Sequence, residues 1–166
     1  STTSRYCLGD SGALFIDAGG RFPPSMPEDP ACVGSATSSL CQSPETVKHH
    51  FRIQHLDGIM AAVGVYSDGA EAEDWRAAEV LFSKGDDFSK GDDEESTESM
   101  ENRVEKLLKV TDHGDDQTFV LAADPEGVNT DAFRAGLAEE VHRGHQLLAI
   151  TRGVEKRKQM ETYLRL

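Results

Sequence analysis

The sequence predicts an α+β fold, because strand-like and helix-like stretches both recur along its 166 residues. Short apolar runs at residues 5–8, 13–17, 59–66 and 118–123 have the length and composition of strands. Apolar residues at helical spacing occupy 73–82, 100–110 and 129–150. Turn-forming Gly and Asp residues separate the strand-like runs. We therefore expect strands packed against several helices.

A β-hairpin is predicted at the start of the chain. The runs 5–8 and 13–17 flank Gly9-Asp10-Ser11-Gly12, whose residues suit a tight turn. Residues 18–20 (Ala-Gly-Gly) close the second strand. Residues 21–45 hold five of the six prolines and read as an irregular excursion over the surface.

The next two runs predict another pair of strands. Residues 46–56 alternate well enough for a strand with Val47, Phe51 and Ile53 on one face, and Asp57-Gly58 supplies a turn. Residues 59–66 are nearly all apolar, as in a strand buried on both faces. That strand leads directly into Ser67-Asp68-Gly69.

An acidic, low-complexity loop is predicted at 85–99, between the helices at 73–82 and 100–110. It contains most of a duplicated hexapeptide, Phe-Ser-Lys-Gly-Asp-Asp, at 82–87 and 88–93. A calcium loop is one interpretation, but the ligand spacing of an EF-hand is absent and a solvated linker is favoured.

The chain is divided into a β-rich part at 1–125 and a helical extension at 126–166. Asn129 or Thr130 could cap a helix that runs to about residue 150, although Gly136 and Gly144 weaken it. A second amphipathic stretch at 154–166 is basic. We expect this tail to lie outside the β-rich portion.

The charge balance is acidic, with 30 Asp and Glu against 17 Lys and Arg and a net charge of −13. Such a surface repels phosphate backbones and anionic membranes, so nucleic-acid and membrane partners are not expected. Three cysteines are too few for a disulfide framework, which suggests a reduced, cytoplasmic setting. There is no signal-peptide pattern. The start at Ser1 is consistent with processing, trimming or a fragment of something longer.

Three acidic residues share one context in the predicted fold. Asp10 lies in a hairpin turn, Asp68 ends a buried strand, and Asp115 precedes another strand. Carboxylates at strand ends can form an oxygen cage for Mg²⁺ or Mn²⁺. Aspartate is also common in turns for local hydrogen-bonding reasons, so this pattern alone leaves a structural role open.

The order of the three motifs resembles the metal-dependent protein phosphatases, the PPM or type 2C family. These motifs are Gly-Asp-Ser at 9–11, Ser-Asp-Gly at 67–69, and Gly-Asp-Asp-Gln-Thr at 114–118. The resemblance covers roughly residues 5–123. It implies an antiparallel β-sandwich flanked by helices, of which this chain would hold the C-terminal part.

The resemblance also implies ligands and an activity. Asp68 and Asp115 would bind one of two Mg²⁺ or Mn²⁺ ions, and Asp10 would help to hold a third. Asp116 occupies a neighbouring motif position, which leaves open which of the two adjacent aspartates coordinates. The implied reaction is hydrolysis of phosphoserine or phosphothreonine in a phosphoprotein substrate by a metal-activated hydroxide.

The departures from the family pattern concern its N-terminal half. The family's phosphate-gripping Arg, Glu-Asp pair and Asp-Gly-x-Gly motif are absent here, and Asp17-Ala18-Gly19-Gly20 comes at the wrong place in the order. We therefore expect either a truncated catalytic domain or a non-catalytic regulatory or interaction module. Self-association, or a separate N-terminal half, would cover the sheet left exposed.

The remaining candidate residues favour structural roles. His142 and His145 are spaced to chelate a metal but lack a third ligand, so surface histidines are favoured. His49, His50 and His55 do not converge. Trp75 is expected to pack between helices.

Overall fold

The computed structural model describes residues 2–7, 12–24, 43–67, 70, 72–82, 99–110, 116–124 and 131–164, with side chains as far as residue 160. Its elements are β1 (Thr2–Cys7), β2 (Gly12–Asp17), α1 (Pro44–His50), β3 (Arg52–Asp57), β4 (Met60–Tyr66), α2 (Asp74–Phe82), α3 (Met100–Val110), β5 (Phe119–Ala123) and α5 (Asp131–Leu164). The α+β class is thereby confirmed, as are the predicted helices at 73–82 and 100–110. Residues 25–42 of the predicted irregular excursion and residues 85–98 of the acidic loop lie outside the described residues.

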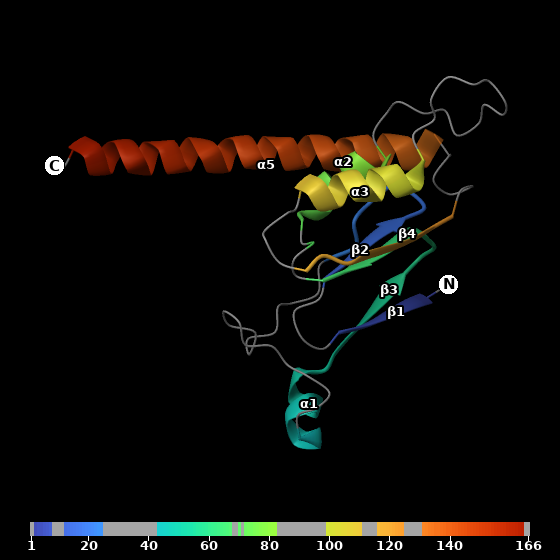
Figure 1. The fold of residues 1–166 in the computed structure, drawn as a ribbon. Coiled ribbons are helices and arrows are strands. Elements are labelled where there is room, and N and C mark those ends of the chain that lie inside the picture. Colours follow the sequence, from blue (N-terminus) through green and yellow to red (C-terminus); the bar gives the residue numbers. More distant parts are fainter. Residues whose placement is uncertain are drawn as a thin grey trace.

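The strands form two small antiparallel sheets (Figure 1). The first pairs β1 with β3, from Thr2 opposite Asp57 to Cys7 opposite Arg52. The second has the order β2-β4-β5, and its central strand β4 is paired on both sides. Helices α2, α3 and α5 cover one face of the β2-β4-β5 sheet, and the β1-β3 pair lies on its other side.

The predicted N-terminal hairpin is wrong in its pairing. In the part of the chain that the structure describes, β1 and β2 belong to different sheets. On β2, Leu14 and Ile16 face the helices, whereas the corresponding inward positions of β1 are Arg5 and Cys7. Strand pairing decides which side chains share one face of a sheet. If β1 paired with β2, the face of β1 with Arg5 and Cys7 could become continuous with the apolar face of β2 that packs against the helices.

The predicted strand at 46–56 is wrong in its first half, where the structure has helix α1. Ser43 caps this helix: its side chain accepts a hydrogen bond from Thr46 N, and Pro44 occupies the first turn. A Ser followed by Pro and Glu is a helix-start signal that competes with the alternating apolar pattern. Strand β3 begins only at Arg52, and the predicted turn after it is confirmed by Gly58 at φ +105°.

The main core lies between the β2-β4-β5 sheet and the helices. Leu14 and Ile16 contribute from β2, and Leu81 and Leu107 contribute from α2 and α3. Phe133 and Leu137 on α5 complete it, so the first part of this helix belongs to the core. The Phe82 ring meets the Phe133 ring edge-on at 5.8 Å.

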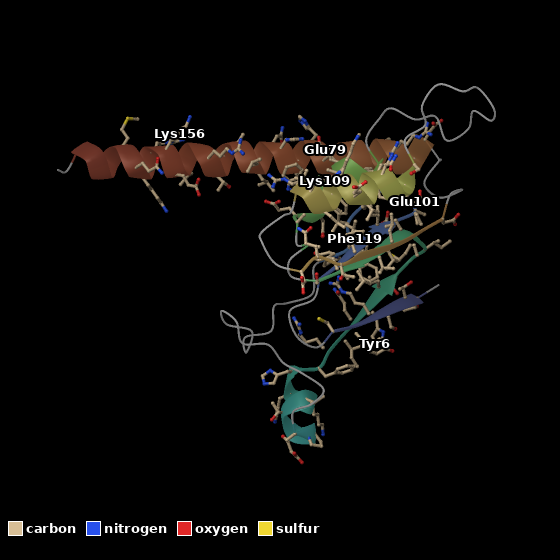
Figure 2. All side chains as sticks on the ribbon, viewed as in Figure 1. Tyr6, Glu79, Glu101, Lys109, Phe119 and Lys156 are labelled. Atoms are coloured by element: carbon tan, nitrogen blue, oxygen red, sulfur yellow. The ribbon has the colours of Figure 1, made fainter. Side chains whose placement is uncertain are left out.

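Helix α5 is continuous from Asp131 to Leu164, so the two separate helical stretches predicted at 129–150 and 154–166 are one. Gly136 and Gly144 are sites of close approach: a Cβ on Gly136 would collide with Gly19 O, and one on Gly144 with the Trp75 ring. Beyond Leu148 nearly every described side chain is exposed, and the helix extends away from the sheets (Figures 1 and 2). The two glycines therefore allow the first half of α5 to dock.

Candidate functional site

The residues that flank the three predicted motifs meet at one end of the β2-β4-β5 sheet. Gly12 pairs with Tyr66 across β2 and β4, and Tyr66 pairs with Phe119 across β4 and β5. Directly opposed residues in antiparallel strands are about 5 Å apart. We call this end, defined by Gly12, Tyr66 and Phe119, the motif end. The described residues next to each motif are thus neighbours, although more than 100 positions separate the first from the last.

Ser67 joins the second and third motifs directly. Its Oγ donates a hydrogen bond to Asp116 O at 3.1 Å and accepts one from Thr118 N at 3.0 Å. Ser67 N also donates to Thr118 O at 3.0 Å. These three bonds fix the backbone that precedes Asp68 against the backbone that follows Asp115. The Ser of the Ser-Asp-Gly motif therefore has a positioning role.

Aromatic rings support the motif end from the helix side of the sheet. The Tyr66 and Phe119 rings stack at 5.9 Å with an interplanar angle of 1°. The Tyr66 ring fills the space above Gly12, where a Cβ would collide with it, and the Phe119 ring lies over Gly64 in the same way. Glycine at positions 12 and 64 permits this stack, which holds the ends of three strands in register.

Of the four predicted ligands, Asp116 alone lies among the described residues. It is exposed at the motif end, and its backbone carbonyl is held by Ser67. Asp10, Asp68 and Asp115 lie outside the described residues. Within the described part of the chain, no three His, Cys, Asp or Glu side chains come together as a metal site would require.

A polar layer between the two sheets was not predicted from the sequence. Arg5 places its guanidinium 5.3 Å from the centre of the Phe15 ring and donates a hydrogen bond to Pro24 O at 2.9 Å. Arg52, opposite Cys7, donates to its Sγ at 3.1 Å. Hydrophobic periodicity does not indicate this inward-facing set, because the apolar Tyr6 and Ile53 lie on the exposed face of the pair.

Asp74, the first residue of α2, lies near Arg5 of this layer and has a strongly shifted pKa. Burial raises the pKa of Asp74 to about 6, and the nearby Arg5 charge opposes that rise. Burial also lowers the pKa of Arg5, an effect that the Asp74 charge counters. Mutual attraction thus offsets only part of the cost of desolvating either group.

The histidines on α5 have the structural roles that the sequence favours. His145 Nε2 lies 2.9 Å from Glu79 Oε1, and its ring packs against Trp75 with centroids 4.8 Å apart. His142 hydrogen-bonds Gln146 at 3.0 Å. The predicted packing role of Trp75 is confirmed, because its ring lies between α2 and Gly144 of α5.

Comparison of this chain with protein-family models, with curated proteins and with solved structures found no significant match. Among the helices of the described residues, none combines the length and apolar character needed to cross a bilayer.

Proposed function

We propose that this chain is the C-terminal part of a PPM-type protein serine/threonine phosphatase domain and carries part of its two-metal site. One observation carries this proposal: the residues flanking all three resembling motifs lie in register at the motif end. The antiparallel order of β2, β4 and β5 brings the three flanking segments to one end of the sheet, as a shared metal site would require. The two described sheets would then belong to the family's β-sandwich.

The proposed ligands are close in sequence to the residues that define this end. Asp68 follows Ser67 directly, Asp115 precedes Asp116 directly, and Asp10 is two residues before Gly12. Consecutive Cα atoms are 3.8 Å apart, so this sequence proximity is compatible with a shared site near the motif end. Carboxylate oxygens are the donors that Mg²⁺ and Mn²⁺ prefer.

In this proposal the chain's own residues position the ligands. The Ser67 hydrogen bonds join the residue before Asp68 to the residues that follow Asp115, and the stacked Tyr66 and Phe119 rings stiffen this end of the sheet. Bound Mg²⁺ or Mn²⁺ ions would activate water and neutralise charge on the phosphoryl group of a phosphoserine or phosphothreonine. The phosphate-gripping Arg and the remaining ligands would come from residues outside this chain.

The first test is a calorimetric Mn²⁺ titration of the chain and of Asp68→Asn. We expect saturable binding that the substitution weakens at least tenfold, because a neutral amide replaces a charged ligand. Asp124→Asn is the matched control. Asp124 follows the opposite end of β5, where its backbone N–H bonds Ala61 O at 2.7 Å, so this substitution should leave Mn²⁺ affinity unchanged.

Equal Mn²⁺ affinity in the chain and in Asp68→Asn would contradict the proposal, as would weakening by Asp124→Asn to the same extent. If the expected pattern holds, hydrolysis of a phosphopeptide should require the chain to be joined to a segment that supplies the remaining motifs. That hydrolysis should be lost in Asp68→Asn.

A further inference from the structure

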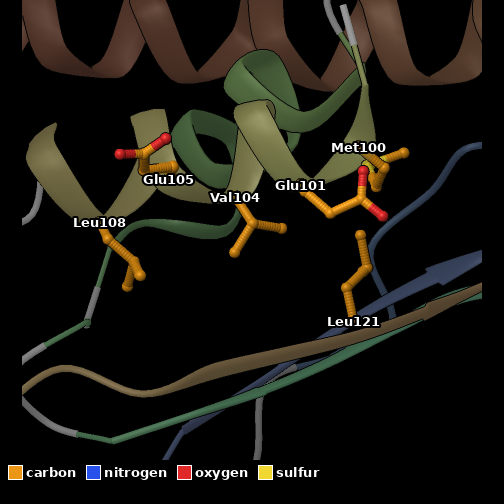
Figure 3. Close-up of a pocket in the computed structure, with 6 residues that line it drawn as sticks. All are labelled: Met100, Glu101, Val104, Glu105, Leu108 and Leu121. Carbon is orange, nitrogen blue, oxygen red and sulfur yellow. The ribbon is translucent and has the colours of Figure 1, made fainter.

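A groove runs between α3 and the strand β5 (Figure 3). Its volume is about 420 Å³, and it is lined by Met100, Glu101, Val104, Glu105, Leu108 and Leu121. We call it the α3 groove. The apolar side chains of α3 and Leu121 of β5 face one another across it, and two glutamates one turn apart stand among them. It therefore combines an apolar surface with negative charge.

The free half of α5 has the complementary character. We call residues 149–160 the α5 arm; Gly153 is half-buried and the other side chains are exposed. Ile150 and Val154 of the arm continue an apolar line that begins at Leu147, just before the arm; the three stand at positions i, i+3 and i+7 from Leu147, with exposed fractions of 59% (Leu147), 63% (Ile150) and 43% (Val154). This spacing places them along one side of a helix, as in helices that dock into apolar grooves.

The charges of the arm and of the groove are opposite. The arm carries four basic side chains, Arg152, Lys156, Arg157 and Lys158, against the single acidic Glu155. Arg157 and Lys158 follow Val154 by three and four residues, so they flank the apolar line one turn further on. In the groove, Glu105 pairs with Lys109 at 3.1 Å, an exposed contact that an incoming arginine could replace.

We propose that the α5 arm of one copy docks into the α3 groove of a second copy, giving a symmetric dimer. The arm does not reach the groove of its own chain, because α5 is straight and leads away from the sheets (Figure 1). Reciprocal exchange of two arms closes the assembly with two-fold symmetry, the commonest arrangement of homo-oligomers. This pairing does not depend on the proposed metal site.

Sedimentation equilibrium of the full chain tests the exchange, with Ile150→Asp as the disrupting variant. We expect a dimer whose dissociation constant rises at least tenfold in the variant, because a charge replaces an apolar anchor. Ile59→Asp is the matched control. Ile59 is also 63% exposed but lies between β3 and β4 and belongs neither to the arm nor to the groove lining, so the dimer affinity of Ile59→Asp should be unchanged.

A charge exchange then identifies the groove. Glu101→Lys with Glu105→Lys, and Arg157→Glu with Lys158→Glu, should each weaken the dimer about tenfold, and a chain with all four changes should recover most of the loss. A monomer at every concentration would overturn the proposal. So would a dimer that Ile150→Asp disrupts while the glutamate changes leave it intact, since the two arms would then pair with each other.

Discussion

Asp74 shows how one side chain can oppose the fold at neutral pH. It begins α2 with a carboxyl group that is largely removed from water, and burial is the main cause of its raised pKa. A helix N-terminus favours negative charge, and Arg5 is nearby, yet desolvation outweighs both. The ionised form is therefore held at a cost in folding free energy.

The free energy of unfolding of the chain should fall as pH rises from about 4 to about 6. The pKa of Asp74 is about 6 in the folded state against an ordinary value of 3.8, so the folded state binds the proton more tightly. Its contribution is fully present below about pH 4 and is lost as pH rises to 6. Asp74→Asn should flatten this dependence and raise the free energy of unfolding at pH 7 by up to about 3 kcal/mol.

Urea unfolding at several pH values between 4 and 8 measures this effect. Asp131→Asn is the control, because Asp131 also begins a helix, α5, but is exposed. Its unfolding curves should follow those of the parent chain. Parallel pH profiles for Asp74→Asn and the parent chain would show that burial of this carboxyl group does not govern the dependence.

At the scale of the element, α5 is one helix with two environments. Its first half is fixed by the glycine contacts, by His145 with Glu79, and by the ion pair of Arg21 with Glu139 at 2.7 Å. The Asp17–Arg21 turn contacts this half of the helix through Gly19, Gly20 and Arg21. Gly20, at φ +74°, lies against the Phe133 backbone. The described side chains of the second half of α5 have neither these contacts nor a buried apolar group.

The same substitution at two glycines of α5 should have opposite effects. Gly144→Ala should lower the free energy of unfolding by about 1–3 kcal/mol, because the new Cβ collides with the Trp75 ring. Gly153→Ala should raise it by about 0.5–1 kcal/mol, since nothing lies within 4 Å and alanine favours the helix. Thermal or urea unfolding of both variants checks the contrast, and two changes of the same sign would contradict the docking described here.

At the scale of the whole molecule, the two sheets differ in how they are supported. The β2-β4-β5 sheet has helices over one face and a strand on each side of β4, whereas the β1-β3 sheet has two strands in the described part of the chain. A two-stranded pair is marginal by itself and depends on packing against its neighbours. Here the facing layer includes Arg5, Cys7 and Arg52 as well as the buried Leu56.

The rates of amide hydrogen exchange should therefore differ between the two sheets. We expect amides of β4 to exchange at least tenfold more slowly than those of β1 and β3, because local opening of the two-stranded pair leaves the main core intact. Hydrogen exchange followed by mass spectrometry on peptides from each strand measures this. Equal protection of β3 and β4 would indicate that the two sheets open as one unit.

Local sequence signals determined much of the chain. The apolar periodicity of 100–110 predicted helix α3 at its observed bounds. The apolar run ending at Tyr66 located β4, the central strand of the motif end. The order of three short motifs predicts a metal site, and both the site and its ligands remain predictions. The helix and the strand depend on residues close together in the chain, and the spacing of apolar residues in the sequence displays such local patterns directly.

Tertiary structure decided how those elements are combined. Strand pairing depends on which faces become continuous, so the turn residues in the sequence at 9–12 did not reveal that β1 pairs with β3 and β2 with β4. Gly136 and Gly144 weaken a helix in isolation, but they stand where α5 must approach Gly19 and Trp75 closely. The sequence by itself determined the local elements, and only contacts between distant residues decided their partners, because burial is a property of the assembled chain.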